Sequence, residues 1–145
     1  MSSPRTSRPG LSALLASALL AVALFPGVAS AQQVKVTLSG DQEVPAVKTA
    51  GAGTGTISVA ADKSVSGSVT TTGVTGTMAH IHEAAPGKNG GVVIPLSKSG
   101  DSTWSVPAGA KLTDAQFNSF KAGNLYVNVH TAANPGGEVR GQLKP

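Results

Sequence analysis

Residues 32–38 alternate between polar and apolar side chains, with Val34, Val36 and Leu38 on one face. Successive side chains of a strand point to opposite faces, so this pattern predicts a β-strand with one buried face. Similar short runs predict further strands at residues 54–60, 65–71, 78–83, 92–96, 102–106, 125–130 and 138–143. A short polar turn separates the runs at 54–60 and 65–71, which predicts a hairpin.

One helix is expected between the last predicted strands. Thr113 and Gln116 have the spacing of a capping box, and Leu112 and Phe117 have the spacing of a hydrophobic staple around the same N-cap. Gly123 provides the residue with positive φ that commonly ends a helix. Seven or eight short strands, one short helix and no repeat of fixed period predict an all-β fold, an antiparallel sandwich or a barrel.

The first 31 residues have the pattern of an export signal. Arg5 and Arg8 precede an apolar run of 15 residues at positions 11–25, and Ala29, Ser30 and Ala31 form a small-x-small cleavage site. A membrane-spanning helix needs about 20 apolar residues, so the run is too short to be a convincing span. We expect residues 1–31 to be a cleaved Sec-type signal peptide. The mature domain, residues 32–145, is then secreted or periplasmic, with no membrane span.

Composition removes several classes of function. The chain has no cysteine, which excludes disulfides, thiolate nucleophiles and cysteine-ligated metals. Loss of Arg5 and Arg8 with the signal lowers the formal net charge from +4 to +2. This small charge, without a cluster of Lys or Arg, argues against nucleic acid as a partner.

The candidate chemistry lies in the three histidines, His80, His82 and His130. His80 and His82 are two residues apart on a predicted strand, so they point to the same face. His130 lies near the end of another predicted strand. If the two strands are neighbours, three imidazoles meet at one rim of the sheet, with ligand nitrogens about 3–4.5 Å apart.

Three imidazoles without sulfur suit copper(II) or zinc and leave a coordination position open. Affinity favours copper by the Irving–Williams order, with zinc as the second choice. The alternative is that His80 and His82 are a surface pair without an ion.

Three other polar residues are candidates near such an ion. Asn128 shares a face with His130 and could orient an imidazole from the second shell, or it could belong to a polar ladder facing water. Glu138 and Arg140 could tune or screen the ion from the last strand, or they could form a plain cross-strand ion pair.

Four longer motifs stand out, at residues 77–83 (TMAHIHE), 87–93 (GKNGGVV), Leu112-Thr113 with Phe117, and 122–142 (AGNLYVNVHTAANPGGEVRGQ). Together they resemble the CHRD domain, the module that is repeated in chordin and occurs singly in many exported bacterial proteins. The likeness covers about residues 34–143. It implies an immunoglobulin-like, Greek-key β-sandwich. In chordin the module is associated with extracellular developmental signalling.

Residues 79–83 (AHIHE) are also similar to the copper-binding strand of copper/zinc superoxide dismutases. That likeness implies that His130 is a later copper ligand and that Arg140 attracts superoxide. The chain departs from that family because it lacks the cysteine pair, the zinc loop and the bridging histidine. With these departures, the likeness implies at most a copper-only variant of that family.

Three functions therefore remain open for the sequence. The first is an exported domain that binds copper through its three histidines. The second is a copper-dependent, superoxide dismutase-like enzyme in which Arg140 supports catalysis. The third is a metal-free module that binds an extracellular protein or a glycan.

Overall fold

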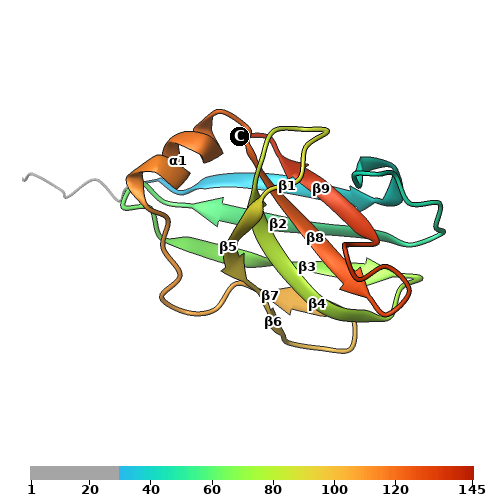
Figure 1. The fold of residues 1–145 in the computed structure, drawn as a ribbon. Helices are drawn as coiled ribbons and strands as arrows, with labels where there is room; N and C mark the ends of the chain where they lie inside the picture. The colour runs from blue at the N-terminus through green and yellow to red at the C-terminus, as the bar shows by residue number, and fades with distance from the viewer. Residues whose placement is uncertain (1–29) are drawn as a thin grey trace, which may run out of the picture.

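Nine antiparallel strands form one continuous sheet in the computed structural model, which describes residues 30–145 (Figure 1). The order across the sheet is β5-β4-β8-β9-β1-β2-β3-β7-β6. The predicted signal peptide lies almost entirely outside the described residues. The strands are β1 (Gln32–Ser39), β2 (Ala52–Val59), β3 (Val65–Thr72), β4 (Gly76–Glu83), β5 (Gly91–Pro95), β6 (Ser97–Lys98), β7 (Thr103–Ser105), β8 (Leu125–Thr131) and β9 (Val139–Leu143).

The sheet folds over on itself into two layers. Strands β5, β4, β8 and β9 form the front layer in Figure 1, and β1, β2 and β3 lie behind them. The two edge strands, β5 and β6, are joined through Leu96, whose backbone N–H donates to the Ala79 carbonyl at 2.9 Å. The all-β antiparallel fold is therefore confirmed, as one nearly closed sheet.

The alternating patterns place the core as expected. The apolar residues at alternate positions of β1, β4 and β8 point inward and are fully or almost fully buried, whereas their neighbours point outward. The β2–β3 hairpin also forms, with Val59 paired to Val65 next to its turn. Strand β6 has only two residues and was not predicted, because so short a run carries no periodic pattern. The inner faces of the two layers thus form one apolar core.

The expected helix is α1 (Asp114–Lys121), which lies at one end of the sheet (Figure 1). The Gln116 N–H donates to Thr113 Oγ1 at 3.2 Å, and the Thr113 N–H donates to Gln116 Oε1 at 2.9 Å, which completes the capping box. Gly123 follows with φ of +77°. Phe120 is fully buried and anchors the helix to the core.

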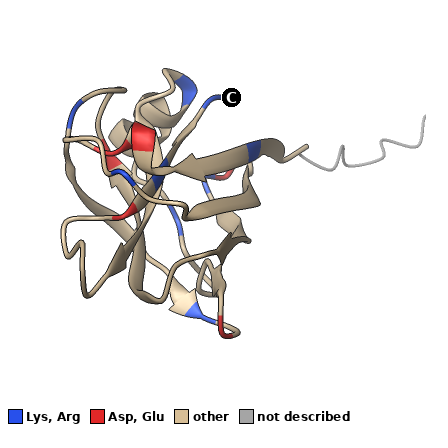
Figure 2. Ribbon diagram, turned by 90° about the vertical axis from the view of Figure 1, so that its right-hand side faces the viewer, with Lys and Arg blue, Asp and Glu red and all other residues tan. Residues whose placement is uncertain are grey.

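The outward face of the front layer is polar, and loops cover part of it. His80 and His82 of β4 lie opposite Asn128 and Tyr126 of β8, and Arg140 of β9 lies opposite Asn128 on the other side. Lys and Arg are distributed singly along the ribbon, with acidic residues among them (Figure 2). No helix within residues 30–145 is long and apolar enough to cross a membrane.

Candidate metal site

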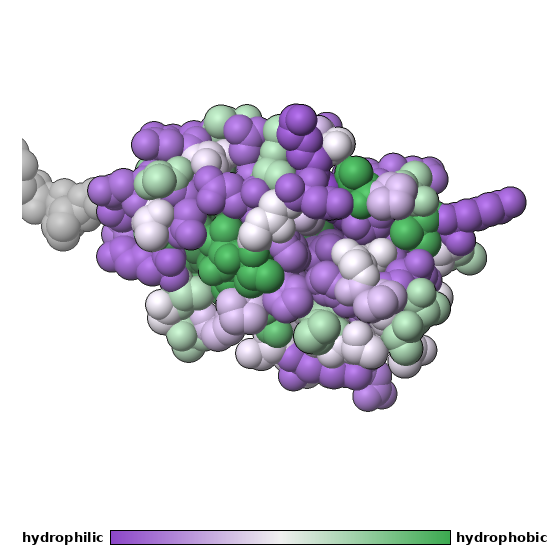
Figure 3. All heavy atoms as spheres, in the orientation of Figure 1, coloured by the Kyte–Doolittle hydropathy of each residue, from purple (hydrophilic) through white to green (hydrophobic). Residues whose placement is uncertain are grey.

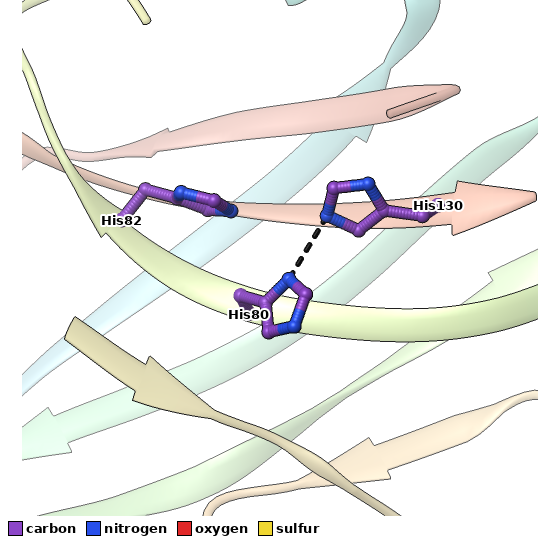
Figure 4. A group of neighbouring side chains, drawn as sticks. All are labelled: His80, His82 and His130. Carbon is purple, nitrogen blue, oxygen red and sulfur yellow. Dashed lines mark hydrogen bonds between the residues drawn. The ribbon is translucent and has the colours of Figure 1, made fainter. Parts of the chain in front are cut away.

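His80, His82 and His130 meet on the outward face of β4 and β8, as the sequence predicted (Figure 4). One ring nitrogen from each histidine lies within 4.8 Å of the others. His80 Nδ1 and His130 Nε2 are only 2.9 Å apart and share a hydrogen bond. His82 and His130 are buried, whereas His80 is partly exposed. We call these three side chains the histidine triad.

Backbone carbonyls determine which nitrogen of each ring carries the proton. His82 Nδ1 lies 3.0 Å from the Gly90 carbonyl, and His130 Nδ1 lies 2.8 Å from the Pro135 carbonyl. A carbonyl can only accept, so in the neutral rings both Nδ1 atoms carry hydrogen and both Nε2 atoms keep a lone pair. The His130 lone pair accepts the proton of His80 Nδ1. Two of the three rings are thus held in the tautomer that can ligate through Nε2.

His82 Nε2 has no hydrogen-bond partner although it is buried. Leaving a buried polar atom without a partner costs about 1–3 kcal/mol, so native proteins seldom keep one without a reason. In Figure 4 the far end of the His82 ring points toward the gap between His80 and His130. The unused lone pair therefore faces the centre of the triad.

The spacing of the triad is slightly wider than that of a loaded site. Metal–nitrogen bonds of about 2 Å require ligand nitrogens about 3–4.5 Å apart. The widest separation in the triad, up to 4.8 Å, must therefore shorten by at least a few tenths of an ångström. The 2.9 Å pair must open slightly when an ion replaces the shared hydrogen.

Burial keeps two members of the triad neutral. It lowers the pKa of the His80 imidazole, and the neighbouring His130 and His82 lower it further. Burial also lowers the pKa of His82, although the hydrogen bond to the Gly90 carbonyl opposes this shift. A neutral imidazole is the form that ligates a metal, so both rings are ready to bind at neutral pH.

Tyr126 packs against His82 of the triad, and Arg140 packs against Tyr126. The Tyr126 ring stacks on the His82 ring, and the Arg140 guanidinium lies 3.5 Å from the centre of the Tyr126 ring. Tyr126 Oη accepts a hydrogen bond from the Gly90 N–H at 3.2 Å. Tyr126 therefore holds both the His82 ring and the residue whose carbonyl fixes its tautomer.

Arg140 is 1% exposed and anchors the loop at residues 84–90. Its guanidinium donates to the carbonyls of Lys88 at 2.8 Å and Ala85 at 3.3 Å, and to Gln142 Oε1 at 3.1 Å. The sequence suggested that this cation attracts superoxide. A buried guanidinium with these partners has little surface from which to attract an anion, and its observed contacts serve to position the loop.

Asn128 lies close enough to His82 to raise the pKa of its imidazole against the effect of burial, whereas Glu138 contacts the turn that carries Pro135 rather than a ring. Asn128 lies beside His82 and Glu43, and its Nδ2 donates to the Gly136 carbonyl at 3.4 Å. The Glu138 carboxylate accepts hydrogen bonds from Thr131 Oγ1 at 2.5 Å and from Thr49 Oγ1 at 2.7 Å. Glu138 thereby holds the turn that carries Pro135, and it acts on His130 only through that turn. The carbonyls of Gly90 and Pro135 hold the His82 and His130 rings through Nδ1, which is the orienting role that the sequence suggested for Asn128.

Glu43 is a buried carboxyl that sequence reasoning missed. It is 6% exposed, and its Oε1 has no hydrogen-bond partner. Burial raises the pKa of this carboxyl to about 7, although the Arg140 charge and Asn128 oppose the shift. Glu43 follows a Gly-Asp-Gln segment whose composition is typical of an exposed loop, so no local pattern predicted its burial. The unpaired Glu43 oxygen lies beside Asn128, next to the triad.

One protein family matches this chain. The model of the CHRD domain family matches residues 34–143, which include every side chain described above. Searches of curated proteins and of solved structures found no match. Because the family model covers most of the chain, the protein belongs to the CHRD domain family.

Proposed function

We propose that this protein is an exported metal-binding protein whose histidine triad holds one transition-metal ion, copper in preference to zinc. The observation that carries the proposal is the buried, unpartnered Nε2 of His82, which faces the other two rings. A metal bond would satisfy this atom, whereas the metal-free triad leaves it without a partner.

Besides the small changes in nitrogen spacing, binding requires a change of tautomer at His80. In the metal-free triad, His80 Nδ1 donates its hydrogen to His130 Nε2. When an ion takes the place of that hydrogen, His80 carries its proton on Nε2 and ligates through Nδ1. The other two rings ligate through Nε2, and the carbonyls of Gly90 and Pro135 keep their hydrogen bonds. Such outer partners hold metal-ligating histidines in orientation.

The donor set supports copper before zinc. Three neutral nitrogen donors bind copper(II) more tightly than zinc by the Irving–Williams order. An exported protein also meets metals outside the controls of the cytoplasm. Export itself rests on residues 1–31, with cleavage after Ala31. Mass spectrometry of the protein recovered from the medium or periplasm tests this part, since the expected N-terminus is Gln32.

Titration of the untagged mature domain with Cu²⁺ and with Zn²⁺ tests the metal site. The expected result is one equivalent of copper, with nitrogen couplings in the electron paramagnetic resonance spectrum. Each of His80→Gln, His82→Gln and His130→Gln should bind at least about tenfold more weakly. Lys35→Gln, on the exposed face of β1, is the matched control and should bind as the wild type does. Wild-type binding in all three histidine variants would reject the site.

A further inference from the structure

We propose that the Met78 thioether is a fourth ligand of the histidine triad and that it allows the site to hold copper(I) as well as copper(II). This inference rests on the metal-binding function proposed above. It adds a sulfur ligand and a preference for the reduced ion, neither of which the three imidazoles alone provide.

The strand pattern places Met78 beside the triad. Met78, His80 and His82 are alternate residues of β4 and share its outward face, because Ala79 and Ile81 between them point into the core. In the pairing of β4 with β8, Met78 lies directly opposite His130. Met78 is therefore a neighbour of His80 along the strand and of His130 across it.

The Met78 side chain can reach an ion at the triad. Directly opposed residues of an antiparallel pair have Cβ atoms about 4.5–5.5 Å apart. A methionine side chain is unbranched and flexible, and Met78 is 50% exposed, so no core packing fixes its thioether. Rotation of this side chain would let the sulfur approach the triad from the side where Met78 borders His80 and His130.

Thioether sulfur changes which ion the site prefers. Imidazole suits both copper(II) and zinc, whereas soft thioether ligands select copper(I). Three nitrogens and one sulfur form a four-ligand set for the reduced ion. Met78 is also the only sulfur-containing residue in residues 32–145, since the chain has no cysteine and its other methionine is Met1.

Met78 is an exposed hydrophobic residue that lies beside the triad. Among the described residues, the large hydrophobic side chains that stay exposed are Met78 and Val92. Val92 lies on β5 opposite His82, so the two residues border the triad from different sides. Apolar side chains gather over β5 in Figure 3. Val92 has no donor atom, which makes it a natural control for Met78.

The experiment compares Met78→Leu with Val92→Thr in the mature domain. Copper(I) affinity is measured under anaerobic conditions by competition with a chromogenic chelator, and copper(II) affinity is measured by calorimetry. Met78→Leu should weaken copper(I) binding by about tenfold or more and change copper(II) binding by less than about threefold. Val92→Thr should leave both affinities unchanged.

X-ray absorption at the copper edge gives a second readout. The copper(I) form of the wild type should contain one sulfur neighbour, and Met78→Leu should lose it. Two results would overturn the role of Met78 and leave the histidine site intact. One is a wild-type copper(I) form without a sulfur neighbour, and the other is a Met78→Leu variant that binds copper(I) as tightly as the wild type does. Failure of the wild type to bind either copper ion would instead reject the proposed function.

Discussion

The imidazole of His82 is stacked on the phenol ring of Tyr126, with ring centroids 4.9 Å apart and ring planes 6° apart. The two residues face each other across β4 and β8. Arg140 reaches the same phenol ring from β9, on the other side of β8. One aromatic side chain thus connects a candidate metal ligand to a buried cation.

Replacing Tyr126 tests whether this stacking positions His82. Tyr126→Phe keeps the ring and loses the hydrogen bond from Gly90, which should cost about 1 kcal/mol of unfolding free energy. Tyr126→Leu also loses the stacking, so it should cost about 1 kcal/mol more and weaken copper binding more than Tyr126→Phe does. Urea denaturation and copper titration of both variants provide the comparison. Equal copper affinities in the two variants would show that the stacking does not position His82.

Arg140 should contribute to stability through the loop at residues 84–90. Arg140→Met leaves the carbonyls of Ala85 and Lys88 without their donor, which should lower the unfolding free energy by about 3 kcal/mol. Hydrogen exchange should rise within that loop before it rises in β8 or β9. If Arg140 acted only as a surface guanidinium, the variant would lose less than about 1 kcal/mol of unfolding free energy and would show no local change in hydrogen exchange.

Glu43 should make the fold less stable as pH rises. Its pKa is about 7 in the fold against an ordinary value of 4.5, so between these values the folded chain keeps a proton that the unfolded chain releases. Stability therefore falls from about pH 4.5 to about pH 7 and then levels off. Glu43→Gln removes this dependence. Its melting temperature should exceed that of the wild type at about pH 8 and match it at about pH 4.

Metal binding should persist in mild acid. Burial lowers the pKa of His80 and His82 below the ordinary 6.5, so both rings stay neutral as the pH falls through that value. Copper should therefore remain bound at about pH 6 and be released only in stronger acid. Equilibrium dialysis across this range measures the occupancy. Release that is half complete at or above pH 6.5 would contradict the lowered pKa values.

Local patterns predicted most of the fold. Alternation identified β1, β4, β8 and β9, and the capping box located the start of α1, because both depend on neighbouring residues alone. The closure of the sheet depends on which distant strands pair. Strand β6 joins β7 at one edge, and β5 joins β4 at the other, and no local pattern determines that arrangement.

The candidate site was predictable in part for the same reason. A period of two places His80 and His82 on one face, whereas the approach of His130 depends on the pairing of β4 with β8. The burial of Arg140 and Glu43 was not predictable, because charged residues are seldom buried and the loops that cover these two have no periodic pattern. The orienting carbonyls of Gly90 and Pro135 belong to the backbone, so no residue type reveals them.

His80 and His130 are 50 positions apart and meet only where β4 and β8 pair. In an unfolded chain, only His80 and His82 are held near each other by the sequence. Capture by all three rings must therefore wait until β4 and β8 have paired, which places metal loading after that step of folding. Once bound, the ion acts as a cross-link between β4 and β8, which are separated along the chain by β5, β6, β7 and α1. Because only the folded chain brings the three rings together, the ion stabilises the folded state and not the unfolded one.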